Sequence, residues 1–219
     1  MSNQRNNSSA STNSAKTTLR KICNTNWHEV AVCAVQIDLQ EYAHLLKFQS
    51  EYILGKNNYR IDLLIIRKLR AEVIPKNIAY IFKTYNLFEI KSIGSSINTD
   101  SYYKTIGYAG LLINQTGKRN QYTALYISLS FLSFHYPKSL INHLQKERNL
   151  IVEKIFNGVC HIINVIFNIQ IIVTKELLPK ENLYLHCLTN NLDDTKLINR
   201  LINDYQCHQT QEIYIKYMN

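Results

Sequence analysis

The sequence predicts an α/β protein with a central mixed β-sheet, helices flanking the sheet and a helical C-terminal segment. Three observations lead to this fold class. Apolar residues make up 46% of the 219 residues, which is ordinary for a globular core. Several short β-rich runs are separated by turn signals, and helical periodicity appears between and after them. A chain of this length suits one domain with small appendages.

The N-terminal half predicts a helical unit followed by strands. Apolar residues recur every three or four positions over 27–49, which indicates an amphipathic helix or a helix pair. β-rich runs follow, separated by turns or polar connections, at 52–54, 59–66, 78–82 and 87–93. Thr99 or Asp100 is expected to cap a helix over 101–114. Small residues at 107, 109 and 110 of that helix would let it pack closely on a sheet.

The C-terminal half alternates strands with short helices and then becomes helical. Residues 121–133 and 169–174 are predicted strands, and 139–146 is a predicted short helix. A hairpin is predicted over 150–164, with Asn157-Gly158 as its turn. Helices are expected over 181–189 and 193–206. We therefore divide the chain into a tail over 1–21, a core domain over 22–178 and a helical extension over 179–219 packed on the same domain.

The charge and the cysteine content indicate which kind of partner the protein has and in which cellular compartment it is found. The formal net charge is +9, and residues 1–21 contribute +4 of it without any acid. The polar composition of that tail predicts disorder. We expect the tail to be either a solubilising extension or an arm that contacts DNA. Five cysteines without a CxxC pair, and no apolar N-terminal segment, predict a cytoplasmic protein with reduced thiols. No apolar run reaches the ~20 residues of a membrane span.

One constellation of residues predicts chemistry. Asp62 and Glu89 interrupt runs that otherwise read as buried strands, and a buried carboxylate is costly unless it is paired or bound to a metal. Glu89 and Lys91 are two positions apart, so they share one face of a strand. The two carboxylates and the backbone carbonyl of Ile90 are hard oxygen ligands that suit Mg²⁺ or Mn²⁺. Lys91 would then position or help deprotonate an attacking water, or neutralise the pentavalent phosphorane. The alternative is an ordinary salt bridge between neighbouring strands.

At these residues the chain resembles the PD-(D/E)XK nuclease superfamily, and most of all its bacterial nuclease family transposases and recombination-promoting nucleases. The resemblance covers roughly 24–210 and is carried by residues 27–29, 59–66, 81–92, 103–108 and 171–177. It implies a restriction-endonuclease-like core in which Asp62 and Glu89 bind the metal and Lys91 is the catalytic lysine. It further implies an accessory acid from the first helix, either Asp38 or Glu29, and a polar residue from the helix after the E-x-K strand. The residues that match this last position are Tyr103 and Lys104.

These observations predict a Mg²⁺- or Mn²⁺-dependent DNA endonuclease that hydrolyses phosphodiester bonds and is associated with a mobile element or recombination. The alternative is a catalytically inactive nuclease-fold protein that binds DNA or another protein. An RNA target for the basic tail has no support from an RNP-like aromatic motif. The sequence leaves a homodimer open.

Overall fold

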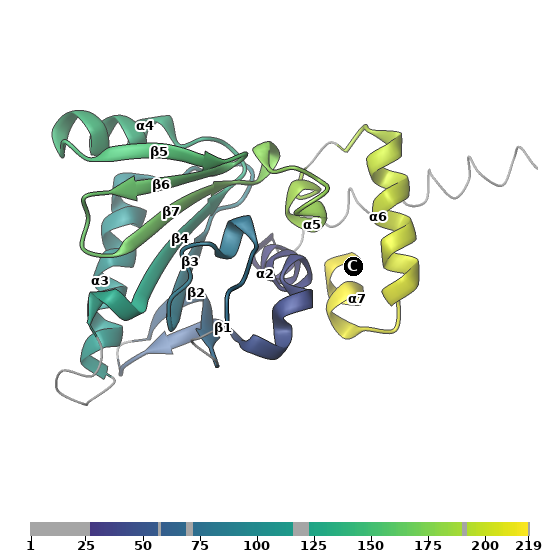
Figure 1. Ribbon diagram of the computed structural model, residues 1–219, viewed down its shortest axis with the longest axis horizontal. Helices are drawn as coiled ribbons and strands as arrows, with labels where there is room; N and C mark the ends of the chain where they lie inside the picture. Colours follow the sequence, from purple (N-terminus) through teal and green to yellow (C-terminus); the bar gives the residue numbers. More distant parts are fainter. Residues whose placement is uncertain (1–26, 57, 69–71, 116–122, 190–191, 219) are drawn as a thin grey trace, which may run out of the picture.

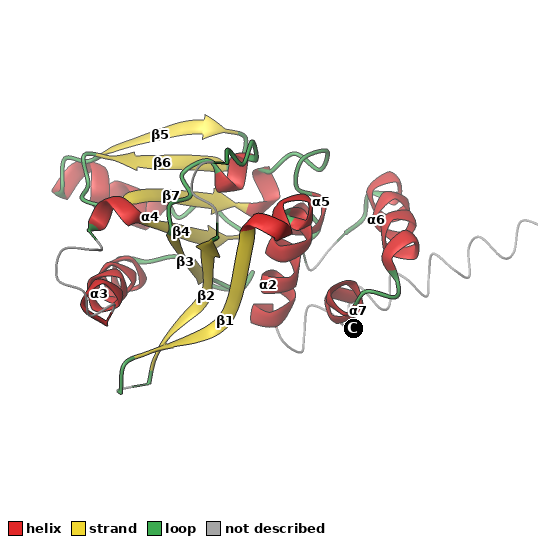
Figure 2. Ribbon diagram, turned by 60° about the horizontal axis from the view of Figure 1, so that its bottom comes forward, coloured by secondary structure: helices red, strands yellow, loops and turns green. Residues whose placement is uncertain are grey.

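The computed structural model describes residues 27–56, 58–68, 72–115, 123–189 and 192–218, and it confirms the α/β fold class. A seven-stranded mixed sheet has the order β1-β2-β3-β4-β7-β6-β5, with helices on both faces (Figures 1 and 2). The strands are β1 (Leu46–Leu54), β2 (Tyr59–Arg67), β3 (Tyr85–Ile90), β4 (Ile127–Ser133), β5 (Ile151–Phe156), β6 (Val159–Ile163) and β7 (Asn168–Val173).

The sheet consists of a parallel centre with an antiparallel pair on each side. β3, β4 and β7 run parallel to one another, whereas β1 and β2 on one side and β6 and β5 on the other pair antiparallel. Every residue of β4 is buried, as parallel strands covered on both faces require. The β5–β6 turn has Gly158 at φ +72°, which confirms the predicted Asn-Gly hairpin.

Two helical layers cover the sheet. On one face lies α3 (Thr99–Gln115), together with α4 (Lys138–Asn142) and the π-helical turn that follows it (His143–Glu147). On the other face lies α2 (Trp27–Asp38), against which α5 (Leu183–His186) and α7 (Glu212–Met218) pack. The remaining helix, α6 (Thr195–His208), begins at Asp194, whose side chain accepts hydrogen bonds from the backbone N–H groups of Lys196 and Leu197.

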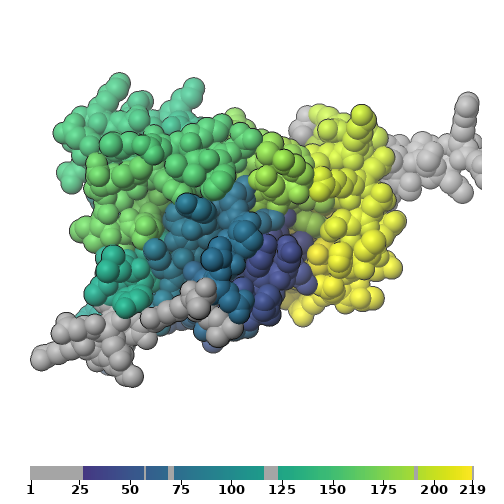
Figure 3. All heavy atoms as spheres, viewed as in Figure 1, coloured from purple at the N-terminus to yellow at the C-terminus, as the bar shows by residue number. Residues whose placement is uncertain are grey.

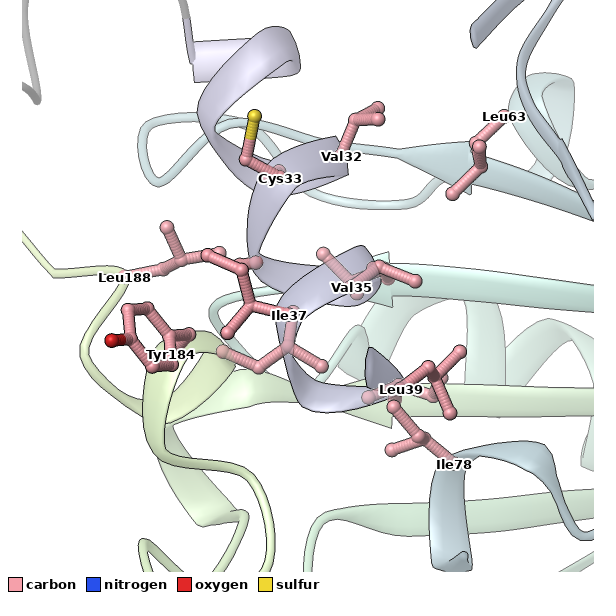
Figure 4. Close-up of a cluster of buried hydrophobic side chains, with 14 of the residues drawn as sticks. Val32, Cys33, Val35, Ile37, Leu39, Leu63, Ile78, Tyr184 and Leu188 are labelled. Carbon is pink, nitrogen blue, oxygen red and sulfur yellow. The ribbon is translucent and has the colours of Figure 1, made fainter. Parts of the chain in front are cut away.

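Helix α2 is apolar on nearly all sides because it lies between two layers. Its buried side chains include Val32, Cys33, Val35 and Ile37, and Figure 4 shows them spread around the helix between the sheet and the C-terminal segment. In the space-filling view the C-terminal helices form one end of the molecule beside α2 (Figure 3). A helix that is apolar all round is typical of a buried position.

The structure corrects several element predictions in the N-terminal half. The periodic segment 27–49 is helical only to Asp38, passes through a 3-10 helix at Gln40–Leu45, and continues as β1. The predicted strand 78–82 is instead the 3-10 helix Asn77–Ala79 and a turn. Its apolar side chains are buried except for Tyr80, which is exposed. Its backbone joins no strand ladder among the described residues, and the carbonyl of Ile78 accepts a hydrogen bond from the Gln170 side chain at 2.7 Å.

Further corrections concern α3, β4 and α5. The side chain of Asn98, rather than Thr99 or Asp100, accepts the N–H of Ser101 at the start of α3. Ala109 is buried as expected, whereas Gly107 and Gly110 are exposed, and a Cβ added at either would meet no neighbouring element within 4 Å. The last two corrections concern segments with less regular structure than predicted. Of the predicted strand 121–133, the described residues 123–133 form a strand from Ile127 onward. Of the predicted helix 181–189, only Leu183–His186 is α-helical.

The predicted basic tail over 1–21 lies outside the described residues. Within the described part of the chain, Cys33, Cys160, Cys187 and Cys207 are free thiols. No described helix has both the length and the apolar character that crossing a membrane would need.

Candidate functional site

The predicted acidic pair lies where β2 and β3 separate. The antiparallel register of the two strands ends with Leu63 opposite Phe88. Asp62 and Glu89 are the next residues on each side of that last pair, and the same register places them opposite each other. Residues opposite each other on antiparallel strands share one face of the sheet, so the two carboxylates lie on the same face at the point where the strands separate.

Asp62 closes the gap between the separating strands with its side chain. Its Oδ2 accepts the backbone N–H of Ile90 at 2.6 Å, at the end of β3. The same oxygen is 3.8 Å from Nδ1 of His28 at the start of α2. Burial raises the pKa of Asp62 and the negative charge of Glu89 raises it further, while the Ile90 N–H, His28 and Lys104 act in the opposite direction.

Glu89 is the most deeply buried charged group of the site, with 3% of its side chain exposed. Its Oε1 receives two ammonium groups, Nζ of Lys91 and Nζ of Lys104, each at 2.8 Å. Its Oε2 has a 3.5 Å contact with the Thr105 hydroxyl, which donates at 2.8 Å to the carbonyl of Ser101 instead. The two lysines therefore compensate one oxygen of a carboxylate that burial would otherwise penalise strongly.

Each lysine is held by its own element. Lys91 directly follows β3, and its carbonyl accepts the indole N–H of Trp27 at 3.0 Å, which ties the start of α2 to the end of the strand. Lys104 comes from the second turn of α3, and its Nζ lies 5.6 Å from the ring centroid of Tyr108. Burial lowers the pKa of Lys104, but the hydrogen bond and charge of Glu89 outweigh burial, so the pKa is raised overall.

The accessory residues that the sequence predicted divide into two groups. Lys104 joins the cluster, and Glu29 lines the same cleft as Asp62. Asp38 is at the opposite end of α2 from His28, where its carboxylate accepts the N–H groups of Tyr184 and Leu185. Tyr103 bonds to His143 through its hydroxyl at 3.0 Å. The structure thus does not bring Asp38 or Tyr103 into the cluster.

A cleft of about 450 Å³ opens in front of Asp62. Its walls come from α2, from the β1–β2 hairpin and from α7, and its charged side chains are of both signs. The charged lining residues are Glu29, Glu51, Arg60, Asp62 and Lys216, together with the titratable His28. The cleft gives solvent and small ions a route to the Asp62 carboxylate.

Asp62 and Glu89 each have one carboxylate oxygen that is available to a divalent cation. Among the described residues, Oδ1 of Asp62 has no hydrogen-bond donor, and Oε2 of Glu89 has only the long Thr105 contact. One oxygen of each carboxylate is therefore free for a cation, which would also relieve the repulsion between the two acids. The described residues contain no cluster of three or more His, Cys, Asp or Glu side chains that could hold a metal. Mg²⁺ commonly keeps several waters and needs only one or two carboxylates.

Three residues of the site are not predicted as functional by the sequence. His28 and Trp27 lie within a stretch that carries the family resemblance, but the residue pattern assigns neither of them a role. Thr105 directly follows Lys104, and only the helical placement of its hydroxyl beside Glu89 reveals its contact. No local signal in the sequence distinguishes Thr105 from other helix residues.

The fold and the cluster define an α/β protein with two carboxylates and two lysines at one end of its parallel strands. Comparisons of the chain with protein-family models, with curated proteins and with solved structures find no match.

Proposed function

We propose that this protein is a metal-dependent DNA endonuclease of the PD-(D/E)XK type, active in the bacterial cytoplasm and linked to a mobile element or to recombination. The observation that carries the proposal is the pair of opposed carboxylates, each with one oxygen that lacks a strong donor, beside the Lys91 ammonium. The free thiols of the described cysteines agree with a reducing compartment.

The residues of the cluster have different roles in the proposed phosphodiester hydrolysis. A bound Mg²⁺ or Mn²⁺ would supply Lewis acidity at a phosphate oxygen. Asp62 and Glu89 would hold the ion, and the Ile90 backbone lies beside them because its N–H donates to Asp62. Lys91 shares Glu89 with Lys104, so it can turn from the carboxylate toward the phosphate while Lys104 continues to neutralise Glu89. Trp27 fixes the backbone at Lys91 and limits that movement to the side chain.

One observation favours the second candidate, an inactive nuclease-fold protein that binds DNA or protein. Two lysines already neutralise Oε1 of Glu89, so the cluster is partly compensated without any metal. A cluster used only for stability would show this arrangement. Activity with a metal therefore decides between the two candidates.

A plasmid-nicking assay with Mg²⁺ or Mn²⁺ tests the proposal. We expect the wild type to convert supercoiled DNA to the nicked form, and Asp62→Asn and Lys91→Ala each to lose at least about 100-fold in rate. Asn keeps an acceptor for the Ile90 N–H, so the strand contact survives. The matched control is Lys154→Ala, which removes an exposed lysine on the far edge strand β5, 3.9 Å from Glu176.

Nicking that persists in both cluster variants would overturn the assignment of the residues. Fluorescence anisotropy with a labelled duplex, measured without metal, separates the two candidates. DNA binding without nicking under any metal would establish the binding module instead of the nuclease.

A further inference from the structure

A second cavity lies between α3 and the β6–β7 connection. Its volume is about 260 Å³, and none of the four cluster residues Asp62, Glu89, Lys91 and Lys104 lines it. Its walls are mainly apolar and come from three separate segments of the chain, 102–106, 144–150 and 164–169. The apolar lining residues include Ile106, Leu144, Leu150, Val165, Phe167 and Ile169.

The side chain of Tyr102 lines this cavity with a hydroxyl that has no partner. Only 3% of Tyr102 is exposed, and its ring stacks on Phe131 with the centroids 5.6 Å apart. Within the described part of the chain, the Tyr102 hydroxyl makes no hydrogen bond. The hydroxyl oxygen itself is not fully buried, so solvent in the cavity reaches it. A polar atom of a ligand can therefore take the place of that solvent as the hydrogen-bond partner.

A cation without an acidic partner lines the same cavity. Arg148 directly follows the π-helical turn, is exposed and makes no ion pair with any described acid. Burial raises the pKa of Tyr102 to about 12 and the neighbouring Tyr103 adds to this effect, whereas the charge of Arg148 lowers it. Both residues line the same cavity, so one ligand can contact the guanidinium and the Tyr102 hydroxyl together.

The Tyr103 side chain at the wall of the cavity is fixed in orientation. Nδ1 of His143 is 2.8 Å from a carboxylate oxygen of Glu147, which selects the tautomer with a proton on Nδ1. Nε2 of His143 then accepts the hydroxyl of Tyr103 at 3.0 Å. The Tyr103 ring is thereby held next to Tyr102, at a centroid distance of 5.2 Å.

We infer that this cavity binds a small carboxylate with an apolar body, its acid group paired with Arg148 and hydrogen-bonded by the Tyr102 hydroxyl. The guanidinium matches a carboxylate in a bidentate geometry. A dianionic phosphate fits less well, because no other cationic side chain among the described residues lines the cavity. The volume is below the roughly 300–1,000 Å³ of typical ligand sites, so the ligand is about the size of one ring with a short acid chain.

Titration of the wild-type protein with 3-phenylpropionate, followed by ligand-observed NMR, tests this inference. We expect the carboxylate to bind at least 10-fold more tightly than its neutral amide, and more tightly than inorganic phosphate. Arg148→Gln should abolish the preference for the acid over the amide. Tyr102→Phe removes only the hydroxyl and should weaken acid binding about 3- to 10-fold.

Lys146→Gln is the matched control, because Lys146 lies in the π-helical turn just before Arg148 but does not line the cavity. The affinity of this variant for the acid should equal that of the wild type. Near-UV circular dichroism checks that each variant keeps its tertiary structure. Equal affinity for acid and amide, an unchanged preference in Arg148→Gln, tighter binding of phosphate, or no binding of the acid would each overturn the inference. All these outcomes are independent of nuclease activity.

Discussion

Replacing Asp38 with Asn should remove a pH-dependent loss of folding stability. Asp38 ends α2, and its two carboxylate oxygens accept the backbone N–H groups of Tyr184 at 3.2 Å and Leu185 at 2.9 Å. Burial raises its pKa from 3.8 to about 7, against the lowering effects of these two N–H groups and of Lys76, with Asp204 contributing a further rise. The folded protein therefore holds this proton more tightly than the unfolded chain does.

The sign and size of the effect follow from the two pKa values. Because the folded-state pKa is the higher one, the contribution of Asp38 to stability is fully present below pH 3.8 and is lost as the pH rises through about 7. A shift of about three pKa units corresponds to up to about 4 kcal/mol, reduced by the part of the side chain that remains at the surface. The Asn amide resembles the protonated carboxyl group of Asp38 in its hydrogen bonding. Both present one acceptor oxygen and one donor group to the two backbone N–H groups.

Urea unfolding of the wild type and Asp38→Asn, measured from pH 4 to pH 8, checks this prediction. We expect the free energy of unfolding of the variant, relative to the wild type, to rise across this range. Asp194→Asn controls for the loss of one carboxylate, because Asp194 is exposed and Asn caps a helix about as well as Asp. A relative stability that stays constant or falls with pH would show that the two N–H groups and Lys76 outweigh burial.

Two glycines give opposite predictions in the same unfolding assay. Gly107→Ala should stabilise the protein by about 1 kcal/mol, since the site is an exposed helix position with open space around the added methyl group; a loss of stability would indicate a contact that this structure lacks. Gly158→Ala should destabilise by about 2–4 kcal/mol, because φ is +72° and the added Cβ would lie 2.7 Å from the Leu177 nitrogen and 2.8 Å from the Val173 oxygen; an unchanged midpoint would contradict the tight hairpin turn.

The sequence predicted the elements whose local signals agree with their tertiary surroundings. The β5–β6 hairpin has an Asn-Gly turn, α6 has an Asp cap, and both form where expected. Residues 46–49 were predicted as helix because their apolar spacing continues that of α2. They form a strand because they pair with β2, from Leu46 opposite Arg67 onward. Strand pairing between distant residues is not visible in local periodicity.

The cluster could be predicted only in part. Alternation along a strand placed Glu89 and Lys91 on one face, and the unusual acid in an apolar run identified Asp62. The contact of Lys104 with Glu89 depends on how α3 packs on the sheet, and the family resemblance suggested it. Asp38 and Glu29 were equivalent candidates in the sequence. The position of each along α2 decides between them, because nine residues of helix span about 14 Å.

The strand order has a consequence for synthesis of the chain. β7 is the last strand to be made, yet it lies between β4 and β6. Until residues 168–173 leave the ribosome, β4 on one side and the β5–β6 hairpin on the other each have an unpaired edge. The residues of the candidate cluster all precede this strand, so they can assemble on an incomplete sheet. Because this central strand is added late, the exposed strand edges leave the nascent protein open to aggregation. Pairing of β7 with β4 and β6 is the step that joins the two halves of the sheet.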